Sequence, residues 1–339
     1  MKKIKAQKIN CFFEEIFDRI NCPKKISRLV IEGLVETSLR GIDSHGIRLL
    51  PHYVKAAKIG RINLNPKIKI KNTSISTAIL DADHTYGIAA ATLAMENSIR
   101  LAKKAGIGCT LVTNSTHFGA AAIYTLLAAK QNMIGISSTN VDALVFPFGG
   151  KELALGTNPL SFAAPVEGED PFCLDMATSI ISWNKLMQSQ KNNKPLKGGW
   201  AADKNGKIGL LPIGEYKGYG LALMVEILCS ILTNMPYGKH VSKMYPLDKK
   251  KRRLGHFLLA LDVSRFLDLT LFKKRLSLLL SELRAITPAA GFKRVKVAND
   301  PENETFKIRI KEGIPVDEDD LISFTRIAKK LKIKTEKYL

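Results

Sequence analysis

This sequence lacks both of the glycine-rich signatures by which nucleotide-binding proteins are most often found. No GxGxxG follows a predicted strand near the N-terminus, and no Walker sequence is present. Both signatures use glycines to bring the backbone close to phosphate groups at the start of a helix. Their absence excludes a standard Rossmann dinucleotide domain and a P-loop.

Cysteine is also scarce, and its spacing fits neither a disulfide framework nor a metal site. The five cysteines (Cys11, Cys22, Cys109, Cys173 and Cys229) are odd in number and form no CxxC pair. Several lie inside apolar runs, where a reduced cysteine behaves as a small hydrophobic residue. This usage is typical of a cytoplasmic protein, and we predict no metal site.

No apolar run is long enough to cross a membrane. The longest run, Leu221–Leu232, contains Glu226 and is shorter than a bilayer span requires. Near the N-terminus, Glu14, Glu15 and Asp18 interrupt any signal-peptide core. We therefore expect a soluble, cytoplasmic protein with no membrane partner.

Acidic residues are few, at 31 Asp and Glu against 52 Lys and Arg, which gives a formal net charge of +21. The lysines are spread along the whole chain, and only Lys249–Arg253 forms a dense basic run. Nucleic-acid binders usually combine such charge with aromatic residues or glycine-rich arms. We interpret the charge as a compositional bias and predict no nucleic-acid partner; a polyanion partner is the alternative.

The composition, with 45% hydrophobic and 24% charged residues, is that of a globular protein. Apolar patterns predict alternating strands and helices through the centre of the chain, which indicates an α/β sheet. The predicted strands are 78–84, 107–112, 133–140, 161–165, 172–175 and 258–263. The predicted helices are 9–20, 26–37, 88–105, 121–131, 180–187, 221–232, 271–283 and a last one that starts at 317–320. We expect a polar loop at 188–197, a hairpin around Asn205-Gly206 and an exposed turn at 299–304.

The first candidate site residue is His117, in the segment Asn114–Gly119 that directly follows the strand 107–112. A titratable imidazole there lies at the C-terminal edge of a strand, where α/β proteins tend to bind ligands. Gly119 and the three alanines after it allow a close approach to the backbone. The alternative is a histidine that merely bonds a neighbouring carbonyl group.

A second polar cluster includes Ser44, His45 and Arg48, with Tyr53 a little further along. The arginine is suited to bind a substrate carboxylate, and the imidazole is suited to donate a proton to an oxygen undergoing reduction. The alternative is helix capping by Asp43 or Ser44 next to a solvated arginine.

Two further segments are candidates for binding a phosphate or a ribose. Asp175 ends a short apolar strand and is followed by hydroxyl side chains, although such an aspartate often caps the next helix. Lys217 lies among glycines just before an apolar helix, which is a plausible anion site.

Five motifs occur in order along the chain: Ser44-His45-Gly46, Asn114-Ser115-Thr116-His117-Phe118-Gly119, Gly156-Thr157-Asn158-Pro159-Leu160, Asp175-Met176-Ala177-Thr178 and Lys217-Gly218-Tyr219-Gly220. Together they make residues 26–331 resemble the type 2 malate/L-lactate dehydrogenase family. The C-terminal part is similar to ureidoglycolate dehydrogenase in Val241-Ser242-Lys243-Met244-Tyr245 and in Ala285-Ile286-Thr287-Pro288-Ala289-Ala290-Gly291-Phe292. One such motif would be weak evidence, but five in family order are strong.

The resemblance implies an α/β fold that is not of the Rossmann type. A central mixed-sheet domain (76–254) would bind the nicotinamide cofactor, and residues 1–75 plus 255–339 would form a discontinuous helical and α/β domain for substrate binding and dimerisation, usually in a homodimer. The implied activity is hydride transfer between NAD or NADP and a small 2-hydroxy or 2-oxo acid of the malate, lactate, ureidoglycolate or sulfolactate type.

The resemblance also assigns site residues. It places His117 and His45 in catalysis, since some relatives use the first position for the proton and others the second, and this choice stays open. Ser44, Arg48 and Tyr53 would hold the substrate. The implied cofactor contacts are Phe172, Cys173, Leu174, Asp175, Met176, Ala177, Tyr216, Lys217, Asn299, Asp300 and Pro301.

The chain also departs from the family pattern. Many relatives have the arginine four residues after the histidine of the first motif, whereas Arg48 comes three residues after His45. A loop of several residues is missing near Lys207, and Asn184 and Glu215 replace common glycines. The alternative function is therefore a degenerate member that binds a cofactor or ligand without efficient turnover.

Overall fold

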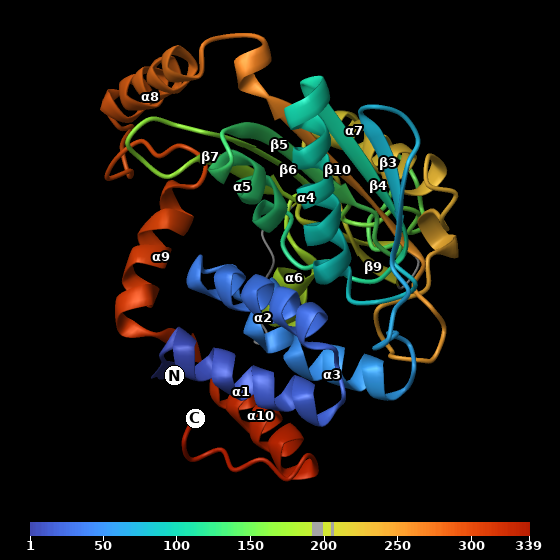
Figure 1. Ribbon diagram of the computed structural model, residues 1–339. Coiled ribbons are helices and arrows are strands. Elements are labelled where there is room, and N and C mark those ends of the chain that lie inside the picture. The colour runs from blue at the N-terminus through green and yellow to red at the C-terminus, as the bar shows by residue number, and fades with distance from the viewer. Residues whose placement is uncertain (192–198, 205–206) are drawn as a thin grey trace.

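The computed structural model describes residues 1–191, 199–204 and 207–339 (Figure 1). A seven-stranded sheet occupies one half of the molecule, and a group of helices from both ends of the chain occupies the other. The two termini lie close together on the helical side, so residues far apart in sequence share one layer.

The central sheet has the strand order β2-β3-β4-β10-β5-β6-β7. Only β3 and β4 pair in parallel, and every other neighbouring pair is antiparallel, so the sheet is mixed as expected. The strand bounds are β2 Lys69–Asn72, β3 Thr77–Asp81, β4 Ile107–Ser115, β5 Met133–Thr139, β6 Leu160–Ala164, β7 Phe172–Met176 and β10 Leu254–Asp262.

Helices cover both faces of this sheet. On one face, α4 (Gly87–Ala105) and α5 (Ala122–Lys130) pack on β4, β5 and β10. On the other face, α7 (Tyr216–Glu226) runs into the π-helical η3 (Ile227–Ile231), which packs on β10. The alternation of strands and helices predicted for the central region is confirmed.

The helical half is built on a second apolar core. It contains α1 (Ala6–Arg19), α2 (Lys24–Leu39), α3 (Leu50–Lys58) and α10 (Glu318–Lys330), with β1 (Lys2–Ile4) paired to β11 (Ile314–Val316). The apolar side chains of α1 recur at helical spacing and are fully buried against α10 through the Phe13–Phe324 contact. Burial of this face holds the two chain ends together.

One sequence-based expectation is wrong: residues 299–304 are not an exposed turn. Helix α9 (Asp300–Glu312) starts there, with Pro301 in its first turn and Asp300 at the positive end of its dipole, both favourable at a helix start. The helix carries no fully buried residue, so it lacks the apolar periodicity that would predict it. It connects α8 (Leu269–Ala285) to the helical half.

The region after β7 contains a helix and a small hairpin. Helix α6 (Trp183–Lys191) extends into the segment predicted as a polar loop, whose remaining residues, 192–198, lie outside the described ranges. Strands β8 (Ala201–Lys204) and β9 (Lys207–Leu210) pair as the expected hairpin, although the turn residues 205–206 are likewise not described. The remaining short helices are η1 Asp43–His45, η2 Ile47–Leu49, η4 Gly238–His240 and η5 Val263–Arg265.

Two strand pairings cross the predicted domain boundaries. β2 pairs with β3 across the boundary placed at 75/76, and β10 lies at the centre of the sheet although the boundary at 254/255 assigns it to the other domain. Each boundary would separate strands that share a hydrogen-bond ladder. None of the helices in the described ranges is long and apolar enough to span a bilayer.

Candidate active site

Ten of the sixteen predicted site residues line one large cavity of about 1190 Å³. It lies where β4, β5 and β7 end, and its wall is completed by η1 and the start of α9. Ligand sites in α/β proteins commonly form at such strand ends. The predicted residues on its wall are Ser44, His45, His117, Cys173, Leu174, Asp175, Met176, Ala177, Asn299 and Pro301.

The two candidate histidines are direct neighbours in this cavity. The rings of His45 and His117 are stacked, with centroids 5.6 Å apart and planes inclined by 22°. His117 Nδ1 lies 2.8 Å from the Tyr53 hydroxyl, and His45 Nδ1 lies 2.8 Å from Ser44 Oγ. These hydrogen bonds engage Nδ1 of each ring, so Nε2 is the nitrogen left for a ligand.

A tight turn after β4 presents His117. Thr116 Oγ1 accepts a hydrogen bond from Gly87 N and donates one to the Thr85 carbonyl, both at 2.9 Å. A side chain at Gly87 would come within 2.2 Å of the Thr116 carbonyl oxygen, so only glycine fits this approach of α4 to the turn. The backbone before His117 is therefore fixed from two sides.

Both site histidines favour the neutral form. Burial lowers the pKa of His45 to about 4, and burial together with His45 and Arg252 places the pKa of His117 well below its ordinary value. Removing an imidazolium from water is costly, and nearby positive charge adds to that cost. A neutral imidazole near pH 7 is suited to accept a proton.

A third histidine is structural. His256 is fully buried on β10, stacks on Phe118 with a centroid distance of 4.8 Å, and bonds Thr139 Oγ1 and Ser115 Oγ at 2.7 Å each. It ties β10 to β4 and β5 through both ring nitrogens. Because both nitrogens are engaged, it has none left for a ligand.

Arg48 does not lie on the cavity wall. Its Nη2 atom is 2.6 Å from Asp317 and 3.0 Å from Asp320, two acidic residues at the start of α10. The next residue, Leu49, lines the cavity instead. This arrangement contradicts the expectation that Arg48 lies ready to hold a substrate carboxylate.

Tyr53 also takes a different place from the one expected. It is buried behind His117, where its hydroxyl bonds Nδ1, and it lines a separate cavity of about 10 Å³ rather than the large one. Its contact is thus with the histidine and not with the substrate space.

The cofactor residues predicted on β7 meet the N-terminus of α5. Asp175 Oδ2 accepts a hydrogen bond from Ala122 N at 2.9 Å, and burial raises the pKa of this carboxyl group to about 6. Gly119 and three consecutive alanines (120–122) line the cavity beside it. Their small side chains leave the backbone open to a ligand, as the sequence predicts.

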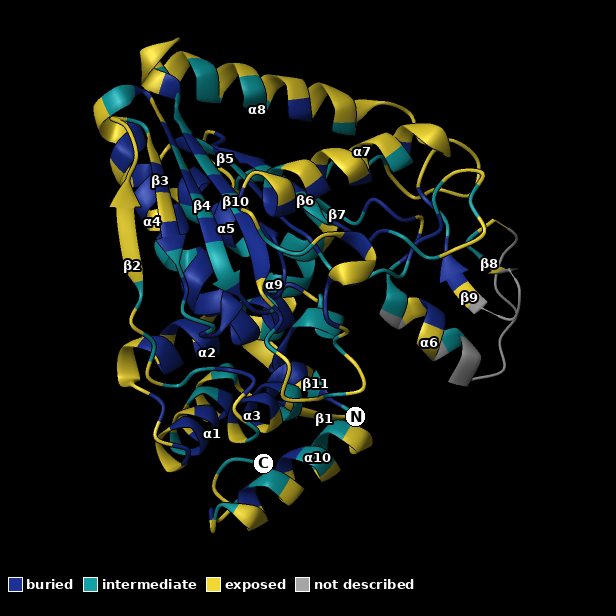
Figure 2. Cartoon of the chain, turned by 90° about the vertical axis from the view of Figure 1, so that its right-hand side faces the viewer, coloured by how far each residue is buried: buried dark blue, intermediate teal, exposed yellow. Residues whose placement is uncertain are grey.

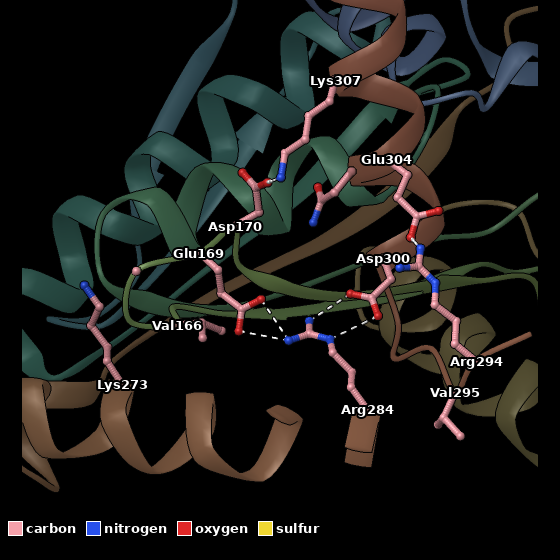
Figure 3. A pocket seen from close by; sticks show the side chains of 12 residues that line it. Val166, Glu169, Asp170, Lys273, Arg284, Arg294, Val295, Asp300, Glu304 and Lys307 are labelled. Atoms are coloured by element: carbon pink, nitrogen blue, oxygen red, sulfur yellow. Dashed lines mark hydrogen bonds and ion pairs between the residues drawn. The ribbon is translucent and has the colours of Figure 1, made fainter. Parts of the chain in front are cut away.

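Four predicted cofactor residues do not line this cavity. Phe172 packs its ring near Phe162, and Tyr216 is 59% exposed, with Lys217 over its ring at 5.9 Å. Asp300 instead lines an outer cleft of about 910 Å³, where it binds Arg284 (Figure 3).

Other residues of the wall carry no motif and were missed. Arg40 reaches Asn303 Oδ1 at 3.1 Å and Asn299 Oδ1 at 3.5 Å, and so joins α2 to the start of α9. Asp142 lines the cavity and pairs with buried Arg252 at 2.8 Å. In each pair the partners are more than a hundred residues apart in sequence, so no local pattern could have identified them.

A mixed sheet with covering helices, and a large cavity holding two neutral histidines at its strand ends, define an α/β protein equipped for proton transfer to a bound small molecule. Among the described residues, no group of three or more His, Cys, Asp and Glu side chains is placed to hold a metal ion.

Comparison with known proteins makes the assignment specific. The pattern of the family described as malate/L-lactate dehydrogenase matches residues 4–323. A malate dehydrogenase of Pyrococcus abyssi is 36% identical over 98% of this chain and 96% of its own length. An NAD(+) ureidoglycolate dehydrogenase of Escherichia coli K12 is 34% identical over 94% of this chain and 93% of its own. The crystal structure of a malate dehydrogenase from Entamoeba histolytica superimposes with a TM-score of 0.94 at 31% identity, covering 98% of this chain and 99% of the other.

The chain belongs to the malate/L-lactate dehydrogenase family, and it is an enzyme of the dehydrogenase class acting on 2-hydroxy acids. The family predicted from the five sequence motifs is confirmed.

Proposed function

We propose that this protein transfers a hydride between NAD or NADP and a small 2-hydroxy or 2-oxo acid, with His117 as the residue that moves the hydroxyl proton. The observation that carries this proposal is the position of His117. Its ring lines the large cavity, its Nδ1 atom is held by Tyr53, and its pKa is lowered. These are the features expected of a general base.

The cavity fits a nicotinamide cofactor together with a small acid. Its volume of about 1190 Å³ exceeds the usual range for a drug-sized ligand. Residues 173–177, the alanines at the start of α5, Asn299 and Pro301 would hold the cofactor. When bound, the cofactor supplies the hydride chemistry.

The chain itself must handle the proton. In the tautomer whose Nδ1–H donates to the Tyr53 hydroxyl, Nε2 is unprotonated and accepts the proton of a hydroxy acid during oxidation. The same nitrogen returns it during reduction. His45 stacks on this ring, and we assign it to orienting the substrate oxygen.

We also propose that the protein is a homodimer. Helix α8 has a single buried residue, Leu280, while Leu278 and Leu279 are about half exposed (Figure 2). On η3, Ile227 and Ile231 are each 56% exposed. Exposed large apolar side chains on a helix are the kind of surface that a subunit interface covers. Sedimentation of the wild type and of Leu278→Glu tests this: a dimer that the substitution weakens is expected, and a wild-type monomer contradicts it.

We further propose two structural units with revised bounds, in which the sheet unit runs from about residue 67 to residue 262. The remaining N- and C-terminal residues form the helical unit. The site then lies between them, because Ser44 and Asn299 come from one unit and His117 and Asp175 from the other.

The activity test is direct. Purified protein is mixed with NADH or NADPH and a panel of 2-oxo acids that includes oxaloacetate, pyruvate and sulfopyruvate, and the reduced-cofactor absorbance is followed. We expect turnover with at least one acid. Folded protein that binds cofactor in calorimetry but turns over no acid would contradict the proposal and favour the degenerate alternative.

A further inference from the structure

A 2-hydroxy acid presents a carboxylate next to the carbon that reacts. The cation that binds this carboxylate must therefore lie beside the residue that moves the proton, here His117. Arg48 does not meet this requirement, because Asp317 and Asp320 bind its guanidinium and Leu49 takes the cavity wall.

The cations on the wall of the large cavity are also poorly suited. Lys296 pairs with Glu304 at 2.8 Å, and Arg40 is bonded to Glu36 at 3.0 Å and to Asn303. Both lie near Asn299, at the start of α9 rather than beside His117. Lys243 is exposed, and a solvated ammonium group gives little binding energy.

Arg252 differs from all of these. It is only 4% exposed, and its Nη2 atom donates to Asp142 Oδ1 at 2.8 Å. Its Nε and Nη1 atoms have no hydrogen-bond partner within the described part of the chain. Buried guanidinium nitrogens are almost always bonded, so two unpaired ones in one side chain indicate a ligand.

The Arg252 guanidinium lies beside His117, where the substrate carboxylate must be bound. Arg252 lines the cavity of about 10 Å³ together with His117, Tyr53 and His52. His117 and Met244 line both this cavity and the large one, so the two spaces adjoin at the histidine. A volume of this size accommodates about one oxygen-sized group.

We propose that Arg252, held by Asp142, binds the carboxylate of the substrate and so replaces Arg48 in this role. This assignment rests on the proposed 2-hydroxy acid activity. A charge-assisted hydrogen bond to a buried guanidinium is short and strong because water does not compete for it. Asp142 is fixed in turn, since it also accepts a hydrogen bond from Met244 N at 3.3 Å.

The test uses two probes of the same shape. Oxamate carries a carboxylate next to a carbonyl group, and oxamide is its uncharged counterpart. Their binding to NADH-loaded protein is measured by calorimetry, and kcat/KM is measured with the best 2-oxo acid. The variants are Arg252→Lys, the double variant Arg252→Met with Asp142→Asn, which leaves no unpaired buried carboxylate, and Arg48→Met.

We expect the double variant to lose at least about tenfold in oxamate affinity, the scale of one hydrogen bond to a charged group, with oxamide binding unchanged. Arg252→Lys should retain part of the affinity, and Arg48→Met should bind oxamate as the wild type does. Circular dichroism and NADH binding establish that each variant is folded.

Two results would overturn the inference: a folded double variant that binds oxamate normally, or an Arg48→Met variant that loses oxamate affinity. Failure of the proposed function is distinguishable from both. If the wild type turns over no 2-oxo acid while oxamate binding still depends on Arg252, the carboxylate site stands and the activity assignment falls.

Discussion

The large inner cavity and the outer cleft adjoin at the start of α9 and have comparable volumes, but their charged and titratable groups are arranged differently. The inner cavity holds two half-buried histidines without an acidic partner, next to a buried guanidinium with unpaired nitrogens. In the outer cleft, Arg284 binds both Glu169 and Asp300, and Arg294 binds Glu304 (Figure 3). Asn299 lines the inner cavity, and Asp300 lines the outer cleft.

This difference distinguishes the candidate active site from a surface cleft lined by ion pairs. The ion pairs in the outer cleft are partly exposed, and each charged group has its partner. Such pairs contribute little to the free energy of unfolding and do not prepare a side chain for catalysis. In the inner cavity, burial lowers the pKa values of both histidines and nothing nearby compensates them. Uncompensated, shifted groups in a cavity mark functional sites. Volume alone would not distinguish the inner cavity from the outer cleft.

The largest effect is expected from the centre of the inner cavity. His117→Ala should lower kcat by roughly a hundredfold or more, because the proton loses its acceptor, while NADH affinity is preserved. His45→Ala should cost less, since His45 is assigned to orientation. Steady-state rates and a fluorescence titration with NADH check both variants. A nearly silent His117→Ala beside an inactive His45→Ala would exchange the two roles.

A smaller effect is expected from Tyr53, the hydrogen-bond partner of His117. Tyr53→Phe removes the hydroxyl that bonds His117 Nδ1 at 2.8 Å and leaves the ring packing in place. We expect kcat to fall by about tenfold, the scale of one hydrogen bond to a charged group, with KM nearly constant. A rise in KM at constant kcat would instead indicate that Tyr53 touches the substrate.

The smallest effect is expected in the outer cleft. Arg284→Met removes two ion pairs from a side chain that is 30% exposed. We expect a loss of about 0–1 kcal/mol in the free energy of unfolding and no change in kcat/KM. Urea unfolding and steady-state assays measure both. A large loss of activity would show that the outer cleft also takes part in the reaction.

The sequence predicted the central strands and most helices because their apolar residues recur at regular spacing. It also predicted the residues that follow β4 and β7, since a strand end fixes where its next residues lie. It could not predict α9, which buries no residue completely. Nor could it predict which way Arg48 points, because a one-residue shift in an irregular segment decides whether Leu49 or the arginine meets the cavity.

The pairing of Asp142 with Arg252 also could not be predicted from the sequence. The two residues are 110 positions apart, and neither belongs to a local motif. Only the folding of β10 between β4 and β5 brings Arg252, just before that strand, to the segment that follows β5. Long-range contacts of this kind require the sheet order, which periodicity does not give.

The most direct test of the central claim is the pH dependence of kcat/KM for hydroxy-acid oxidation in wild type, His117→Ala and His45→Ala. The pKa of His117 is lowered, so the base stays unprotonated down to pH values below its ordinary 6.5, and activity falls only as the pH drops through the lowered value. We predict this acidic limb in the wild type and in His45→Ala and its loss from the residual activity of His117→Ala. An unchanged limb in His117→Ala, with its loss in His45→Ala, would contradict the account.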